Sequence, residues 1–509
     1  MTGETHAPPT RLASHALGAQ KRSIVTTRKP NVIFIIADQH RWDFVSWQNN
    51  GVTHTPNLQR LAAAGVTFRS AYCNSPLCCP SRQSIASGRY GVNSGCFTNL
   101  HELPPGTPSF VQQFRDAGYH TCAVGKTHME IHAYDSDLTA DYHLRFMDSL
   151  GWDETHETSG SSMLMSGITC AYSRFLQQEG KLDDVVRFYD FWWRSPEKTS
   201  RPDPYFLTQT WSLPEHLQET PFTARTAIDW LNARDRSRPF FLHVGFAAPH
   251  SPVEPLQRFL DLYSADDESP PFGAQKPSNT LPHDRTGYRA TISGIDHYVG
   301  RILDTLDQQN ILDNTIVLYL ADHGEMAGDH DRFGKTCFFE GSIRVPLIIA
   351  GPGVQKGRTT DALVELIDLG STLCDLCDVP AHSLDQGRSL RPVLTEPRDT
   401  HRETVYAEMG CDRMLFDGRY KLMWGDPWSD TRKLGTLHLD KPVNIPPSPC
   451  RLYDMHSDPN ELNNLAQDPS HAERLAAMEE KLLVRQNQNN QPRPNKPRGK
   501  LNLRETRST

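Results

Sequence analysis

The sequence lacks the features that would direct it to a membrane, to nucleic acid or to a disulfide-stabilised fold. No run approaches the ~20 apolar residues of a membrane-spanning helix, and the most apolar early run, residues 32–37, has the length of a strand. The formal net charge of −8 argues against a nucleic-acid partner, and it requires local cations to attract any anionic substrate. Eleven cysteines at irregular spacing predict no paired framework, which favours a reducing compartment.

Other absences limit how the chain is organised. Residues 1–30 lack the apolar core of a signal peptide, so we expect residues 1–29 to be a disordered extension and the protein to be cytoplasmic. No internal repeat is visible, and no two cysteine pairs have zinc spacing. Cys374 and Cys377 form one CxxC within a helical pattern over residues 363–377, which favours two packed thiols over a metal or redox site.

What is present is an alternation of strand-like apolar runs with helical patterns, which is typical of an α/β fold with a mixed, mostly parallel central sheet between helices. Strands are predicted at 31–37, 121–124, 239–246, 315–321 and 345–350, and helices at 55–64, 223–232 and 288–308. Between residues 131 and 220 the pattern weakens. The aromatic run at 188–193 is interpreted as part of loops over a site, and Trp211 as packed in the interior. We expect one catalytic domain over residues 30–395.

The pattern changes after residue 395. Short runs at 403–408, 413–416 and 419–424 predict a small antiparallel sheet, and residues 471–485 predict a helix. Residues 396–485 are therefore expected to form a C-terminal α+β subdomain. Residues 486–509 are rich in Gln, Asn, Pro, Lys and Arg without periodicity, and we expect a disordered tail there.

Polar residues follow two of the predicted strands at equivalent places. One strand ends in Ala37-Asp38-Gln39-His40 and another in Ala321-Asp322-His323-Gly324. The carboxyl ends of parallel strands lie at one edge of a sheet, so Asp38 and Asp322 can share a cation if their strands are neighbours. Two carboxylates, an imidazole and an amide suit Ca²⁺, Mn²⁺ or Mg²⁺ better than zinc. Taken alone, each aspartate is equally well a helix cap.

The run Cys78-Cys79-Pro80-Ser81-Arg82 places a cysteine at the start of a predicted helix. Pro80 fits a first helical turn, and nothing in residues 81–87 would stop the helix. Residue 78 is then expected at a helix N-terminus, where unpaired N–H groups favour anions, with Arg82 projecting back toward it. A buried cysteine pair beside a turn is the alternative interpretation.

This CxPSR run resembles the signature of the type I sulfatases of the alkaline phosphatase superfamily, in which the first cysteine is oxidised to formylglycine. One hydroxyl of the hydrated aldehyde attacks sulfur, and the other later collapses to the carbonyl and expels sulfate. Residues 321–349 resemble the family segment that binds metal and sulfate. The resemblance implies that Lys335 binds sulfate and that the metal is held by Asp38, Gln39, Cys78, Asp322 and His323. Arg82, as a fixed cation in the first helical turn, can orient the diol.

One position departs from many relatives, which have a second Asp where this chain has Gln39. The change leaves one negative charge fewer around the cation, as in the choline sulfatase and phosphonate monoester hydrolase branches. Ca²⁺ and Mn²⁺ both stay open as the metal, and Mg²⁺ is less favoured.

Two further blocks resemble the same family. GYHTCAVGKTH at residues 118–128 implies that Lys126 and His128 contact the sulfate and the attacking hydroxyl. FFLHVGFAAPHSP at residues 240–252 implies that His250 lies near the leaving group. His128 is then expected to remove a proton from the second hydroxyl, and His250 or Lys335 to protonate the departing alkoxide. Asn99 lies where some relatives have a substrate-contacting asparagine.

The resemblance implies hydrolysis of a sulfate ester to an alcohol and inorganic sulfate, with formylglycine and one divalent metal. A phosphonate monoester or phosphodiester hydrolase of the same superfamily is the alternative enzyme, and a non-catalytic anion-binding protein is the alternative of another class. The expected partners are a small sulfated substrate, whose alcohol is a sugar, an aryl group or choline-like, and a formylglycine-generating maturation enzyme. A homo-oligomer stays open.

Overall fold

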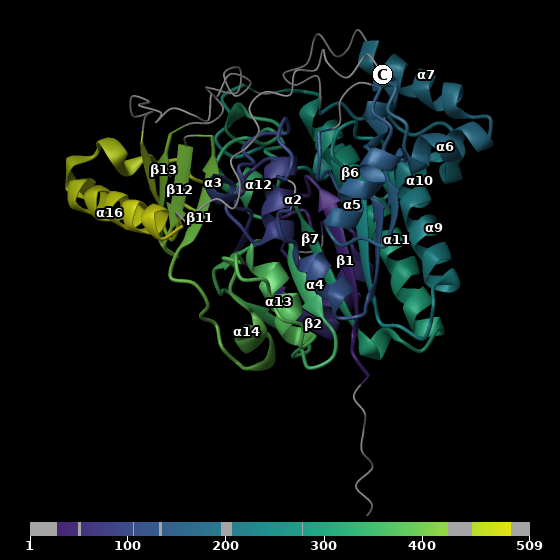
Figure 1. Cartoon of the computed structure of the whole chain (residues 1–509). Coiled ribbons are helices and arrows are strands. Elements are labelled where there is room, and N and C mark those ends of the chain that lie inside the picture. The colour runs from purple at the N-terminus through teal and green to yellow at the C-terminus, as the bar shows by residue number, and fades with distance from the viewer. Residues whose placement is uncertain are drawn as a thin grey trace, which may run out of the picture.

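The computed structural model describes residues 28–48, 52–104, 106–131, 135–194, 206–276, 278–410, 412–425 and 450–489. Its centre is a sheet with the strand order β5-β4-β6-β1-β7-β8-β2-β9 (Figure 1). Strand β8 is antiparallel to β7 and β2, and the other neighbouring strands are parallel, so the predicted mixed, mostly parallel sheet is confirmed. The strands are β1 (Asn31–Asp38), β2 (Gly65–Phe68), β4 (His120–Gly125), β5 (Glu154–Glu157), β6 (Phe240–Pro249), β7 (Thr315–Ala321), β8 (Leu347–Ala350) and β9 (Arg358–Thr360).

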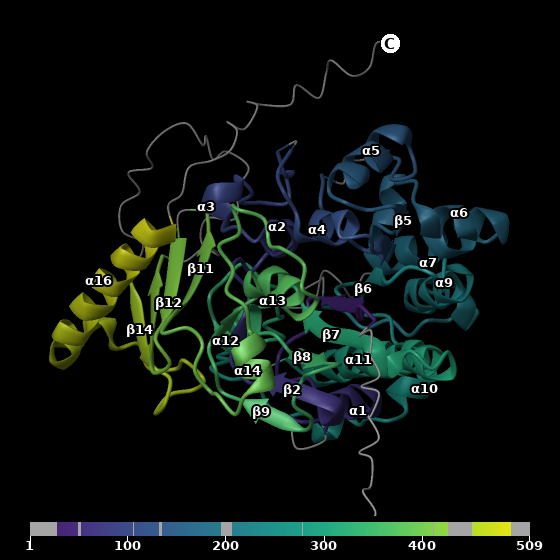
Figure 2. The same cartoon turned by 60° about the horizontal axis from the view of Figure 1, so that its bottom comes forward.

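Helices cover both faces of this sheet (Figure 2), and that is why its central strands are continuous apolar runs. One face packs against helices α1 (Pro56–Ala64), α9 (Glu219–Ala233) and α11 (Leu281–Gln308). The other packs against α2 (Cys78–Ser87), α4 (Phe110–Asp116) and α13 (Asp368–Leu376). Every residue of β1 is buried, from Asn31 to the carboxylate of Asp38.

The register of β1 and β7 positions the functional edge of the sheet. The two strands are parallel neighbours, and Ala37 lies opposite Ala321. Asp38 and Asp322 therefore follow paired residues, and the expectation that their strands are neighbours is confirmed.

The C-terminal part forms a separate antiparallel sheet of β11 (Val405–Met409), β12 (Asp412–Phe416), β13 (Tyr420–Trp424) and β14 (Arg451–Asp454). Helix α16 (Ala472–Asn489) packs across it through Met478 and Leu482, at the left of Figure 1. The buried Lys421 ammonium joins this sheet to helix α12 (Glu340–Ile343) and to the loop after β14, because its Nζ lies 2.8 Å from Glu340 and 2.7 Å from Glu461. The boundaries at residues 30, 395 and 485 stay predictions, although α16 itself continues to Asn489.

The prediction of loops between residues 131 and 220 is wrong for much of that segment. It contains α5 (Asp141–Ser149), α6 (Ala171–Gln178) and α7 (Leu182–Arg194). The aromatic run at 188–193 lies within α7, where Phe188 and Tyr189 pack against Trp211 in a satellite core. Phe188 and Tyr189 are buried whereas Phe191 is exposed, so burial of the face that carries Phe188 and Tyr189 holds the helix in place.

The helical pattern at residues 363–377 divides into β10 (Val364–Glu365) and α13, and Cys374 and Cys377 are buried and unpaired, as expected for packed thiols. The remaining short strands and α-helices are β3 (Ala71–Tyr72), α3 (Gly91–Ser94), α10 (Gln257–Leu260) and α14 (Arg391–Thr395).

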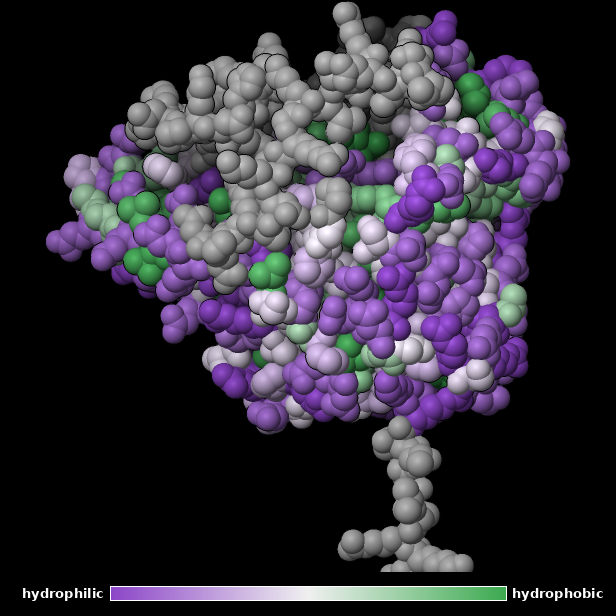
Figure 3. Space-filling view, in the orientation of Figure 1, coloured by the Kyte–Doolittle hydropathy of each residue, from purple (hydrophilic) through white to green (hydrophobic). Residues whose placement is uncertain are grey.

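Within the described ranges, no helix combines the length and the apolar character needed to cross a bilayer. The described surface visible in Figure 3 is mainly hydrophilic with scattered apolar residues, which places most apolar side chains in the core. Most of the predicted N-terminal extension and C-terminal tail falls outside the described residues.

Candidate active site

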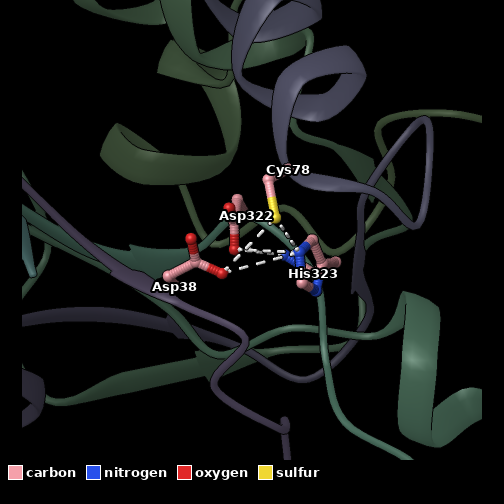
Figure 4. A group of neighbouring side chains, drawn as sticks. All are labelled: Asp38, Cys78, Asp322 and His323. Carbon is pink, nitrogen blue, oxygen red and sulfur yellow. Dashed lines mark hydrogen bonds and ion pairs between the residues drawn. The ribbon is translucent and has the colours of Figure 1, made fainter. Parts of the chain in front are cut away.

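Four of the predicted site residues meet at the carboxyl edge of the central sheet (Figure 4). Asp38 ends β1, Asp322 and His323 follow β7, and Cys78 is the first residue of α2. One ligand atom from each lies within 4.8 Å of the other three, and all four side chains are buried. The structure therefore brings the two acidic strand ends and the cysteine of the CxPSR run together.

The donor set of this cluster fits a divalent cation. The Nε2 atom of His323 lies 3.7 Å from Asp38 Oδ1 and 3.7 Å from Asp322 Oδ1. Its other nitrogen, Nδ1, donates to the Gly324 carbonyl at 3.0 Å, which leaves Nε2, 3.3 Å from Cys78 Sγ, as the nitrogen that can bind a cation. Oxygen donors with one imidazole match Ca²⁺ or Mn²⁺.

Arg82 aligns the second acid. Its Nε donates to Asp322 Oδ2 at 2.7 Å, its Nη1 donates to the Lys126 carbonyl at 2.7 Å, and its Nη2 lies 3.5 Å from Asp38. The other Asp322 oxygen accepts the backbone N–H groups of Gln39 and His323 at 3.0 Å each. In the structure the Arg82 guanidinium contacts the two carboxylates, and its expected role in orienting a diol at residue 78 stays a prediction.

Two lysines concentrate positive charge around Cys78. Lys335 Nζ donates to Cys78 Sγ at 3.0 Å and to Gln39 Oε1 at 2.6 Å, and Lys126 Nζ lies 2.6 Å from Asp38 Oδ2. Burial opposes ionisation of the Cys78 thiol, but Lys335, His323 and Lys126 outweigh it and hold its pKa well below the ordinary value.

The neighbouring Cys79 differs. Burial raises its pKa well above the ordinary value, and its Sγ lies 3.3 Å from the His128 carbonyl. Its backbone N–H donates to Asn99 Oδ1 at 3.0 Å, so Asn99 satisfies one of the unpaired N–H groups at the start of α2. The structure thus places Asn99 against the backbone of the residue after Cys78, and its predicted contact with substrate stays a prediction.

His128 stands on a constrained turn after β4. Its φ is 54°, in the left-handed region that non-glycine residues rarely adopt. A single oxygen, Glu157 Oε1, accepts the backbone N–H groups of Thr127 at 3.2 Å and of His128 at 3.0 Å. Burial lowers the pKa of His128, and the hydrogen bond of His128 with Cys78 partly offsets this decrease.

Behind this turn lies a buried network that the sequence did not reveal. His143 Nε2 is 2.9 Å from Glu157 Oε2, and its Nδ1 contacts Glu130. Burial opposes the charge on His143, but its hydrogen bonds to Glu130 and Glu157 raise its pKa to about 10. None of the three residues belongs to a recognisable motif, so only the tertiary structure identifies them.

His250 directly follows β6 and is half-buried, with Nδ1 2.8 Å from the Ser251 carbonyl. It acts electrostatically on the site. The pKa of the Asp38 carboxyl is raised by burial and by Cys78, but Lys126, His250 and Lys335 together bring it below its ordinary value. Lys126 and His128 after β4, His250 after β6 and Lys335 thus approach the cluster of acids and cysteine from three segments.

Comparisons with known proteins agree with this architecture. The sulfatase family model matches residues 30–379, which is more than half of the chain. The predicted class, a sulfuric ester hydrolase, is therefore confirmed. The chain belongs to the sulfatase family. It is 28% identical to the arylsulfatase of Clostridium perfringens, over 90% of this chain and 94% of that protein. It is also 28% identical to the choline-sulfatase of Rhizobium meliloti, over 87% and 84% of the two chains.

A solved structure shows the same fold. The phosphonate monoester hydrolase of Agrobacterium radiobacter superposes with a TM-score of 0.71 at 23% identity, over 91% of this chain and 96% of that one. The expected fold, a mixed, mostly parallel sheet between helices, is therefore confirmed.

Proposed function

We propose that this protein hydrolyses the sulfate ester of a small alcohol, with residue 78 acting as formylglycine. The observation that supports this most strongly is the place of Cys78. It opens α2 and lies 3.3 Å from His323, 3.7 Å from Asp38 and 3.0 Å from the Lys335 ammonium. An oxidised side chain at this position would meet a helix N-terminus, a lysine and the candidate cation site together.

Asp38, Gln39, Asp322 and His323, with residue 78, would hold one Ca²⁺ or Mn²⁺ ion. When bound, such an ion neutralises negative charge on oxygen and favours the deprotonated form of a neighbouring hydroxyl. Arg82 keeps Asp322 aligned for this role through its 2.7 Å hydrogen bond.

The remaining polar residues divide the work of sulfuryl transfer. Lys126 and Lys335 supply fixed positive charge for the oxygens of the sulfuryl group, whose negative charge must be stabilised while the ester bond breaks. His128 has a lowered pKa, so its neutral form is available to accept a proton from the second hydroxyl of residue 78. His250, which follows β6 at the edge of the site, donates a proton to the departing alkoxide.

The alcohol is proposed from the relatives. The names of the curated relatives, an arylsulfatase and a choline-sulfatase, support an aryl or a choline-like alcohol, and a sugar is the third candidate. A maturation enzyme must oxidise Cys78, and the proposed compartment is the cytoplasm.

Parallel assays of an aryl sulfate and an aryl phosphonate monoester test the proposal. The wild-type protein, matured in its native host, is expected to cleave the sulfate faster, while Cys78→Ala and Asp322→Ala abolish turnover. Cys374→Ala is the matched control, because Cys374 is a buried thiol of α13 whose charged neighbours are Asp385 and Asp375, and its replacement is expected to leave turnover intact. Unchanged turnover in Cys78→Ala would contradict the proposal, and faster cleavage of the phosphonate would establish the alternative enzyme.

A further inference from the structure

Gln39 presents a neutral amide between two charged side chains. Its Nε2 donates to Glu325, and its Oε1 accepts from Lys335 Nζ at 2.6 Å. A carboxylate only accepts hydrogen bonds and an ammonium only donates them, so these two partners fix which end of the amide faces which way. The Lys335 ammonium also contacts Cys78 Sγ, and Oε1 therefore faces the cluster of predicted ligands while Nε2 faces away.

The backbone also constrains Gln39. Its φ of 67° lies in the left-handed region, and its N–H donates to Asp322 Oδ1 at 3.0 Å. A non-glycine residue in this conformation costs about 1 kcal/mol or more, and the surrounding contacts must hold it there. The hydrogen bond to Glu325 is one of those contacts.

Glu325 is an unusual partner because it is a buried acid that binds no cation side chain among the contacts seen in the described residues. It is 1% exposed. Its Oε1 accepts the backbone N–H groups of Ala327, at 3.0 Å, and of Gly334, and its Oε2 accepts from Gln39. Gly334 directly precedes Lys335, so one carboxylate fixes both the amide of Gln39 and the loop that carries the lysine.

We propose that Glu325 is a positioning residue for the metal site. It orients the Gln39 amide with Oε1 toward the cation, and it supplies from behind Gln39 the negative charge that a neutral ligand does not provide. The inference rests on the proposed function, which requires a divalent ion at Asp38, Asp322 and His323. An acid that orients a ligand in this way typically changes metal affinity by about 10- to 100-fold when it is neutralised.

Calorimetric titration of the metal-free protein with Ca²⁺ and with Mn²⁺ tests this without any turnover assay. Glu325→Gln keeps the shape and one acceptor oxygen, and it is expected to weaken binding by about 10- to 100-fold. The exchanged pair Gln39→Glu with Glu325→Gln keeps the charge and the donor–acceptor match, so it is expected to recover most of the lost affinity. Asp296→Asn is the control, since Asp296 is a buried carboxylate that accepts backbone N–H groups of α1, and its loss is expected to leave the affinity unchanged.

The outcomes separate the two proposals. If the wild-type protein binds neither ion, the metal of the proposed function fails. If the wild type binds but Glu325→Gln binds equally well, or the exchanged pair binds no better than Glu325→Gln, only the role of Glu325 is overturned. If Glu325→Gln is too unstable to titrate, the exchanged pair is titrated instead. In that variant the stability of the fold and the metal affinity must both return. Failure of either overturns the proposed pairing of Glu325 with Gln39.

Discussion

Replacement of His143 tests the buried network behind His128. His143 lies between Glu157 and Glu130 with no exposed surface, and these hydrogen bonds raise its pKa to about 10 against a desolvation cost that would lower it. In the unfolded chain its pKa returns to its ordinary value of 6.5. The folded state therefore favours the imidazolium, and this stabilisation is fully present below pH 6.5 and is lost as the pH rises through 10.

The size of the effect follows from the two pKa values. Each pH unit between them contributes 1.36 kcal/mol, so the stabilisation from His143 declines by about 4 kcal/mol between pH 7 and pH 10. His143→Gln removes the titrating group. The difference in unfolding free energy between wild type and variant is thus expected to be large at pH 7 and to shrink by about that amount at pH 10.

Urea denaturation under reducing conditions at several pH values measures this difference. His243→Gln is the matched control: burial lowers the pKa of His243 to about 4, so the residue is neutral throughout this range and its replacement should cost the same at each pH. A difference for His143→Gln that does not change between pH 7 and pH 10 would refute a charged His143 between two carboxylates. Because Glu157 holds the turn that carries His128, the same variant is also expected to lower kcat more than it raises KM.

Three further predictions concern the site itself. Lys335→Ala removes the ammonium 3.0 Å from Cys78 Sγ and is expected to lower kcat on an aryl sulfate by about 10²- to 10³-fold in steady-state assays; a loss below tenfold would contradict its role at the sulfuryl oxygens. His250→Ala is expected to slow an alkyl sulfate more than an activated aryl sulfate, because the poorer leaving group needs the proton more, and equal losses would argue against proton donation by His250. In unconverted protein, iodoacetamide is expected to modify Cys78 before Cys79, since their pKa values shift in opposite directions, and the reverse order in peptide mapping would contradict that charge environment.

The sequence predicts the frame of the site because that frame depends on local pattern. The apolar runs before Asp38 and Asp322 are strands that pair with each other, and Cys78 opens a helix as expected from Pro80. The short strands β2, β5 and β9 were not predicted. They contain at most four residues, which is too few for a period to be recognised.

The supporting residues could not be predicted for a different reason. Glu157, His143 and Glu130 come from three segments between residues 130 and 157, and only folding places them in one chain of contacts. The long helix α11 begins at Leu281, before the start predicted at residue 288, because its first turns are packed against the core even though their sequence is polar. Tertiary burial, and not propensity, decides both cases.

The most direct test of the account is the mass of the tryptic peptide of residues 70–82, isolated from protein made in its native host and alkylated with iodoacetamide. This peptide contains Cys73, Cys78 and Cys79. We expect two alkylated cysteines, at 73 and 79, and a residue 78 that is about 18 Da lighter than cysteine, because its thiol is converted to an aldehyde. A peptide with three alkylated cysteines and no lighter form would show that residue 78 stays a thiol, and would contradict the proposed mechanism.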